Sequence, residues 1–151
     1  MSNYINSFNP VDSSLIQRHK ITSKLEIENY LDNSFFVFKK WSNYTFSKRK
    51  SALLSFQKIL IKNQEELAEM ISLETAKSKL ESAQEVSGAI NKINLTIQAY
   101  NDRVFSFKKS VNDKVLQLSQ KPLGIILVLG PFNFPVHLPL GHILPAILTG
   151  N

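Results

Sequence analysis

The last thirty residues of this chain, 122–151, contain no aspartate, glutamate, lysine or arginine. Such a segment is normally buried, because an unpaired charge inside a core is costly. It also holds five of the six prolines and four of the five glycines. Its first part, 123–129, is short and apolar on both faces, which predicts a strand covered on both sides, as in parallel α/β sheets. The strand ends at Gly130-Pro131, and the following turn carries Asn133, an uncharged amide of the kind that can stabilise developing negative charge.

Composition restricts the chemistry available to the chain. Its 151 residues fit one domain, and contents of 43% hydrophobic and 20% charged residues are those of a globular protein. The absence of cysteine excludes disulfides, thiolate metal sites and a cysteine nucleophile within these residues.

The net charge of +6 raises the question of a nucleic-acid partner. The excess lies in residues 1–60, which carry nine basic and four acidic groups, and the only tight cluster is Lys48-Arg49-Lys50. Such a triplet is typical of a solvated helix face, so no nucleic-acid partner is expected. The polar start lacks a secretory signal, and prolines interrupt every apolar stretch before the ~20 residues that a membrane span needs. We therefore expect a cytoplasmic chain with no membrane partner.

Residues 1–110 read as mainly helical after an irregular lead with a turn at Asn9-Pro10. A capping box at Ser23-x-x-Glu26 predicts a helix that ends near Trp41. Further helices are expected at 47–62, after an Asn63-x-x-Glu66 cap, and at 77–103. The last helix has an apolar stripe at near 3.5-residue spacing, formed by Val86, Ile90, Ile93, Ile97, Tyr100 and Val104. A coiled coil is the alternative, but the stripe is short and lacks ordered flanking charges, which favours packing on a core.

After residue 110 the hydrophobic period changes. A turn at 111–114, strands at 115–119 and 124–129, and a crossover helix at 135–148 are expected. The fold class is therefore α/β: a helical N-terminal part (1–110), the turn and strand that follow (111–122), and the first strand and helix of an incomplete parallel sheet (123–151). The family resemblance given below implies that this sheet is Rossmann-like and that 111–122 is an arm.

Several motifs have ordinary structural interpretations. No GxGxxG or Walker A pattern occurs, so phosphate loops have no support. His137 and His142 are five residues apart, which does not suit one helical face, so we expect half-buried histidines bonded to backbone and no metal site. Spacing alone favours Asn133 as the N-cap of the following helix over a donor to a reacting group.

Two sequence motifs near the C-terminal end resemble those of a known family. The run Pro122-Leu-Gly-Ile-Ile-Leu-Val-Leu-Gly-Pro-Phe-Asn-Phe-Pro135, followed by Pro145-Ala-Ile-Leu-Thr-Gly-Asn151, is similar to the start of the coenzyme domain of aldehyde dehydrogenases. Glu74-Thr75-Ala76-Lys77 stands where that family often has Glu-Thr-Gly-Lys. His137-Leu-Pro-x-Gly-His142 and Asn91-Lys-Ile resemble the N-succinylglutamate 5-semialdehyde dehydrogenases of arginine breakdown.

The resemblance implies a mechanism and a site. A cysteine adds to the aldehyde, Asn133 helps to hold the resulting oxyanion, hydride passes to NAD or NADP, and a glutamate-activated water releases the acid. The backbone of Leu129, Gly130, Pro131 and Phe132 lines the nicotinamide side of the cleft. Residues 111–122 form an oligomerisation arm, which implies a homo-oligomer, and the partner is a small-molecule aldehyde.

The chain lacks the catalytic residues that the family pattern requires. It has no cysteine and no acid after Asp113, and the residues that hold the adenosine and pyrophosphate should lie beyond Asn151. We therefore expect a truncated aldehyde dehydrogenase that is inactive and binds no NAD(P) alone. The alternative is a small non-catalytic helical interaction protein that uses the 86–104 stripe as its partner surface.

Overall fold

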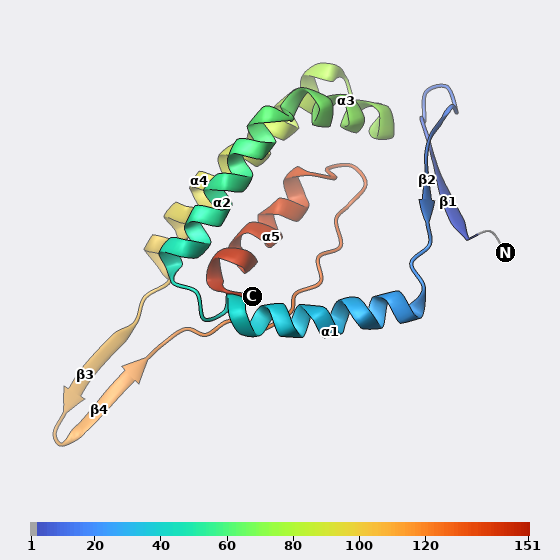
Figure 1. Cartoon of the computed structure of the whole chain (residues 1–151). Coiled ribbons are helices and arrows are strands. Elements are labelled where there is room, and N and C mark those ends of the chain that lie inside the picture. Colours follow the sequence, from blue (N-terminus) through green and yellow to red (C-terminus); the bar gives the residue numbers. More distant parts are fainter. Residues whose placement is uncertain (1–2) are drawn as a thin grey trace.

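The computed structural model describes residues 3–151, and the helices α2, α3, α4 and α5 pack together as its body (Figure 1). Helix α1 lies across one end of this body. One β-hairpin stands beyond the N-terminal end of α1, and a second projects away from the end of α4. In chain order the elements are β1 (Tyr4–Phe8), β2 (Leu15–Lys20), α1 (Lys24–Trp41), α2 (Phe46–Lys62), α3 (Gln64–Thr75), α4 (Lys79–Arg103), β3 (Phe107–Val111), β4 (Lys114–Leu118) and α5 (His137–Thr149).

The core lies where α4 contacts α2 and α5. Its buried residues are Leu53, Leu60, Ala89, Ile93, Ile97, Leu140, Leu144 and Leu148. The apolar stripe of α4 therefore packs on a core, as predicted, and does not form a coiled coil. Helix α5 is apolar on almost every face, but only its stripe of Leu140, Leu144 and Leu148 is buried against the other helices.

Serine caps begin two of the helices. Ser23 Oγ accepts from the Glu26 amide at 3.2 Å while the Glu26 carboxylate accepts from the Ser23 amide at 2.8 Å, which confirms the predicted capping box. Ser78 and Glu81 form a second such box, so α4 begins at Lys79 and not at residue 77. Helix α3 begins directly after Asn63, as predicted, but the Asn63 side chain makes no capping hydrogen bond to it and instead donates to the Ile59 carbonyl at the end of α2.

The N-terminal lead is more ordered than the sequence predicted. Strands β1 and β2 pair antiparallel, with Tyr4 opposite Lys20, and the expected turn at Asn9 joins them. The strands escaped prediction because they carry too little alternation of polar and apolar residues to be distinguished from a polar loop.

A second hairpin occupies the region of the predicted arm. Strands β3 and β4 pair around Asn112, which lies in the left-handed region at φ 53°, so the turn at 111–114 is confirmed. The hairpin begins at Phe107, however, inside the segment predicted to be helical. Both strands are exposed along their whole length, and the hairpin projects away from the helices (Figure 1).

The apolar segment 123–129 differs from its prediction. It has no strand partner among the described residues, and Leu123, Leu127 and Leu129 are 93%, 82% and 84% exposed. The expected buried strand is therefore wrong for these residues taken alone, because a strand is defined by neighbours that pair with its edges. The helix after it is confirmed as α5, shifted by one or two residues.

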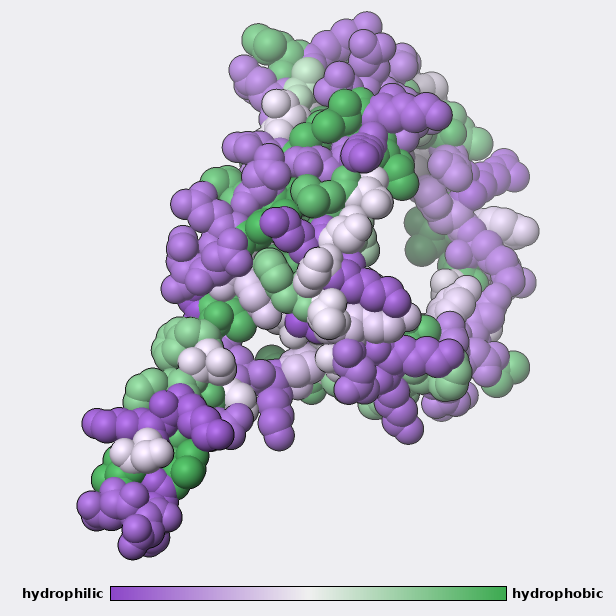
Figure 2. Space-filling model, turned by 60° about the vertical axis from the view of Figure 1, so that its left-hand side comes forward, coloured by the Kyte–Doolittle hydropathy of each residue, from purple (hydrophilic) through white to green (hydrophobic). Residues whose placement is uncertain are grey.

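Apolar side chains are also exposed elsewhere. Helix α1 buries none of its residues, and its stripe of Ile27, Leu31 and Phe35 faces solvent. The space-filling view shows an opening through the molecule that side chains do not fill (Figure 2). Within residues 3–151, no helix combines the length and apolarity that crossing a membrane requires.

Candidate functional site

Asn133 lies in the turn between the exposed apolar segment and α5. The side chain is exposed, and no group in the described part of the chain forms a hydrogen bond with it. The N-cap of α5 is Val136, and no side chain on this turn makes a capping hydrogen bond. The interpretation of Asn133 as a helix cap is therefore wrong, and its carboxamide is free to donate to a ligand.

A glutamate on a neighbouring helix performs the capping that the turn itself does not. Glu85 of α4 has a fully buried side chain, and its Oε1 accepts from the amides of Val136 and His137 at 3.0 and 3.1 Å. A carboxylate at a helix N-terminus satisfies orphan donors and interacts favourably with the helix dipole. Glu85 therefore fixes the beginning of α5, three residues after Asn133.

Lys77 completes this arrangement. Its Nζ donates to Glu85 Oε2 at 2.6 Å and lies 3.7 Å from the centroid of the Phe134 ring. Burial by itself raises the pKa of Glu85, but the hydrogen bonds from Lys77 and from the two α5 amides outweigh it, so the net pKa is lowered. The carboxylate is thus charged and paired at neutral pH.

The other side of the turn is held by close packing. A Cβ on Gly130 would lie 2.4 Å from Cγ of Pro139, so only glycine allows the end of the apolar segment to approach α5 this closely. The neighbouring candidate residues are open to solvent, with Leu129 84% and Phe132 88% exposed. Residues 129–133 therefore form one exposed strip that is anchored at both ends.

Two residues from the preceding helices hold the C-terminal end of α5. Trp41 Nε1 donates to the Ile147 carbonyl and Arg49 Nε to the Leu148 carbonyl, each at 2.9 Å. Arg49 is buried, and its second donor binds the Tyr44 carbonyl. Cations and donors are favourable here because the last carbonyls of a helix lack partners and carry partial negative charge.

Asn151 joins this end of α5 to the start of the apolar segment. Its Oδ1 accepts from the amides of Leu123 and Gly124 at 2.6 and 3.0 Å. Its Nδ2 donates to the Ala146 carbonyl and to Thr149 Oγ1. The segment is therefore tied to α5 at its beginning by Asn151 and near its end by the contact of Gly130.

The histidines differ from the prediction. His142 is exposed, whereas His137 is half-buried and its Nδ1 is buried without a hydrogen-bond partner among the described residues. Burial, reinforced by the charge of Lys92, lowers the pKa of His137 against the opposing effect of Glu85. Lys92 Nζ donates to the His137 carbonyl at 2.7 Å, and burial lowers the pKa of this lysine too. Neither imidazole bonds the backbone, so that expectation was wrong.

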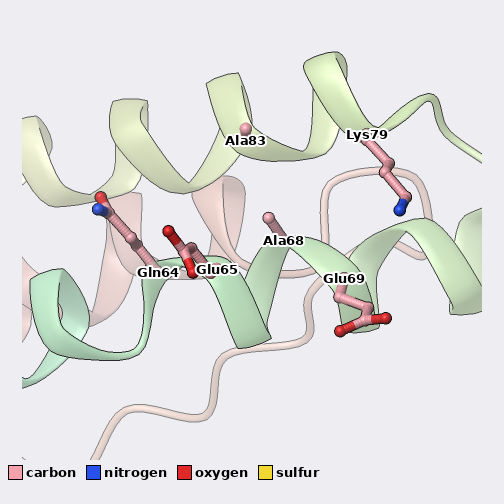
Figure 3. Close-up of a pocket in the computed structure, with 6 residues that line it drawn as sticks. All are labelled: Gln64, Glu65, Ala68, Glu69, Lys79 and Ala83. Carbon is pink, nitrogen blue, oxygen red and sulfur yellow. The ribbon is translucent and has the colours of Figure 1, made fainter.

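Two surface hollows lie away from this turn. A shallow groove between α3 and α4 is lined by Gln64, Glu65, Ala68, Glu69, Lys79 and Ala83 (Figure 3). A larger apolar hollow of about 720 Å³ lies between α1, α2 and α5, and Ile125 and Ile126 form part of its wall. Neither contains Asn133. Within residues 3–151, no group of three or more histidine, aspartate or glutamate side chains could hold a metal ion.

The strongest supporting residues of the turn were not found from the sequence. Glu85 carried a usable signal, because it lies one residue before Val86 and four before Ala89, on the buried face of α4. A carboxylate at such a position requires partners. Lys77 belongs to the Glu74-Thr75-Ala76-Lys77 motif, but nothing in the sequence pairs it with Glu85, which it meets through the turn between α3 and α4.

The fold matches the N-terminal part of an aldehyde dehydrogenase, as comparison with known proteins shows. The model of the aldehyde dehydrogenase family matches residues 1–151, and the chain belongs to this family. It is 41% identical over 147 residues to an N-succinylglutamate 5-semialdehyde dehydrogenase of Legionella pneumophila (strain Corby), and 35% identical over 143 residues to the protein of that name in Escherichia coli (strain K12). These matches cover 97% and 95% of this chain but 30% and 29% of the relatives.

Solved structures show the same fold. The chain superposes on glyceraldehyde-3-phosphate dehydrogenase of Methanocaldococcus jannaschii DSM 2661, complexed with NADP, with a TM-score of 0.89 and 26% identity, over 97% of this chain and 32% of that one. The corresponding Bacillus halodurans C-125 enzyme gives 0.91 at 24% identity, over 98% and 32%. The predicted family and fold class are therefore confirmed, and the chain spans about a third of the length of these proteins.

Proposed function

We propose that these residues supply the N-terminal part of the coenzyme domain of an NAD(P)-dependent aldehyde dehydrogenase that oxidises N-succinylglutamate 5-semialdehyde to N-succinylglutamate in arginine breakdown. The observation that carries the proposal is the free carboxamide of Asn133, exposed on a turn that is anchored on both sides. The substrate is proposed from the names of the relatives that are 35–41% identical.

The role of Asn133 follows from the chemistry of aldehydes. When a nucleophile adds to the carbonyl carbon, the oxygen becomes an oxyanion, which a preorganised N–H donor stabilises more than it stabilises the neutral carbonyl. The carboxamide of Asn133 remains neutral at every working pH and has no competing partner within residues 3–151. One such donor typically contributes about 3 kcal/mol to the transition state.

The strip formed by Leu129, Gly130, Pro131 and Phe132 fits one face of a nicotinamide. It is exposed and largely apolar, and Gly130 keeps the backbone close to α5. NAD(P), when bound, supplies the acceptor for the electrons that leave the aldehyde. Residues 122–151 have no lysine or arginine, so any cationic side chain that binds the phosphates lies elsewhere. The nucleophile and the deacylating base must also come from outside these 151 residues, which have no cysteine and no acid after Asp113.

The exposed hairpin of β3 and β4 suits a contact between copies. Val115, Leu116 and Leu118 are 50–59% exposed and would gain by burial against another surface. We propose that this hairpin, with the rest of the predicted arm at 111–122, mediates a homo-oligomer in the assembled enzyme. The interaction-protein alternative loses its surface, since Val86, Ile93 and Ile97 of the 86–104 stripe are buried.

Activity of an assembled enzyme tests this proposal. The chain is co-expressed with the part of the Legionella pneumophila relative that follows the matched residues, and NADH or NADPH formation from N-succinylglutamate 5-semialdehyde is followed at 340 nm. We expect turnover from the complex and none from the 151-residue chain alone. Asn133→Ala should lower kcat about 100-fold, whereas Asn101→Ala, an exposed change on α4, should not. A complex that turns over no aldehyde, or an Asn133→Ala complex with full kcat, refutes the proposal.

A further inference from the structure

The turn that carries Asn133 is held by a charged pair from a different part of the chain. Glu85 binds the two amides that begin α5, and Lys77 bridges Glu85 to the ring of Phe134. These contacts involve residues one, three and four positions after Asn133. Lys77 is 18% exposed and Glu85 is fully buried at the side chain, so the pair is largely shielded from solvent screening.

Stabilisation of the fold alone does not require a pair of this construction. A buried ion pair is weak evidence for stability, because desolvation of both charges offsets their attraction. Here the contacts converge on one short segment: Glu85 accepts from the Val136 and His137 amides, and Lys77 contacts the ring of Phe134. The pair therefore fixes the geometry of the turn, while the exposed side chain of Asn133 makes no hydrogen bond to the described residues.

We propose that Lys77 and Glu85 are positioning residues for the oxyanion donor, setting the turn so that the Asn133 carboxamide is held in a fixed orientation. This inference rests on the proposed function of Asn133, although its first test does not require activity. Catalytic donors must be placed within a fraction of an ångström, so an unsupported turn would lose most of the benefit of the amide. Lys77 acts through Phe134 and Glu85, and neither charged residue touches the substrate.

The first test measures order in the turn itself. Amide hydrogen exchange of residues 132–137 is followed by NMR in the ¹⁵N-labelled chain. Lys77→Met is compared with Lys79→Met, which changes an exposed lysine at the start of α4. We expect Lys77→Met to accelerate exchange at the Val136 and His137 amides by about tenfold while the Ile93 amide is unchanged. Lys77→Arg, which keeps the cation, should restore slow exchange.

Two results would overturn the proposal at this stage. One is a Lys77→Met chain whose turn exchanges as slowly as that of the Lys79→Met control. The other is uniform acceleration across α4 and α5, which indicates a general loss of stability. Glu85→Gln, with Glu69→Gln as its exposed control, provides the second variant. Its carboxamide oxygen can still accept, so it should loosen the turn less than Lys77→Met without unfolding the chain.

The second test asks whether Lys77 acts through Asn133, in the complex described for the proposed function. Lys77→Met should lower kcat about tenfold when Asn133 is present and less than about twofold when Asn133 is alanine, with the KM for NAD(P) unchanged. Equal losses in both backgrounds contradict a positioning role. If the complex is inactive, the proposed function fails, and the exchange measurement still decides whether the pair orders the turn.

Discussion

Leu127 and Leu144 are the same residue type in opposite surroundings. Leu127 is 82% exposed on the apolar segment, while Leu144 is 1% exposed between α5 and the helices around it. If the apolar segment is an interior strand whose neighbours belong to the rest of an aldehyde dehydrogenase, the two alanine substitutions should behave oppositely in the chain alone and alike in the assembled enzyme.

The magnitudes follow from burial. Leu→Ala in a core costs about 2–5 kcal/mol, depending on how far the surroundings collapse. Leu144 also borders the apolar hollow, so its neighbours can partly fill the space that the substitution leaves. We therefore expect Leu144→Ala to cost about 3 kcal/mol, near the middle of this range. Leu127→Ala removes atoms that already contact water, so it should change the free energy of unfolding of the chain alone by less than about 0.5 kcal/mol.

Urea denaturation of the chain alone measures the first half of this prediction. With a slope of about 2 kcal/mol per molar urea, Leu144→Ala should lower the midpoint by about 1.5 M and Leu127→Ala should barely move it. The second half is the affinity for the complementing part. Once Leu127 is enclosed by neighbouring strands, its truncation should cost about 3 kcal/mol, or roughly a 150-fold weaker Kd. The reasoning is refuted if Leu127→Ala destabilises the chain alone as Leu144→Ala does, or if it leaves complex formation unchanged.

Further predictions concern the ends and loops of the helices. Arg49→Met should destabilise the chain by about 3 kcal/mol in urea, because two buried carbonyls lose a charged donor, while the exposed Lys58→Met stays within about 0.5 kcal/mol. Burial lowers the pKa of His137 below 6.5 in the folded chain, so as the pH falls this histidine is protonated more readily in the unfolded chain than in the folded one. The free energy of unfolding should therefore fall as the pH drops below about 6.5. His137→Asn should weaken this pH dependence and His142→Asn should not; equal slopes contradict it. Ala76 has φ 58°, a left-handed conformation that strains alanine but not glycine. Ala76→Gly should therefore raise the free energy of unfolding by up to about 1 kcal/mol and raise the thermal midpoint, and a lower midpoint would contradict backbone strain at this residue.

Much of the fold could be predicted because its signals are local. The capping box at Ser23, the period of the α4 stripe and the turn around Asn112 each depend on residues within one or two turns of chain. The β1–β2 hairpin could not be predicted, because its pairing is set by contacts across the turn and its exposed strands lack a regular apolar face.

The site divides in the same way. Asn133 and the glycine at position 130 belong to one continuous motif, so their placement on a single turn follows from the sequence. The support of that turn does not, since Lys77 and Glu85 are more than forty-five residues away and meet it only through the packing of α4 on α5. The prediction for the apolar segment failed for another reason: its pattern predicts a covered strand, but no described residue pairs with it.

Amide hydrogen exchange along residues 124–130 tests most directly whether the apolar segment becomes an interior strand when the rest of the enzyme is present. In the chain alone we expect these amides to exchange at nearly the rate of an unstructured peptide, while those of α4 are slow. On addition of the complementing part of the relative, they should become as slow as α4. Amides already protected in the isolated chain, or still unprotected in a complex that has formed, would contradict an interior strand of an aldehyde dehydrogenase sheet.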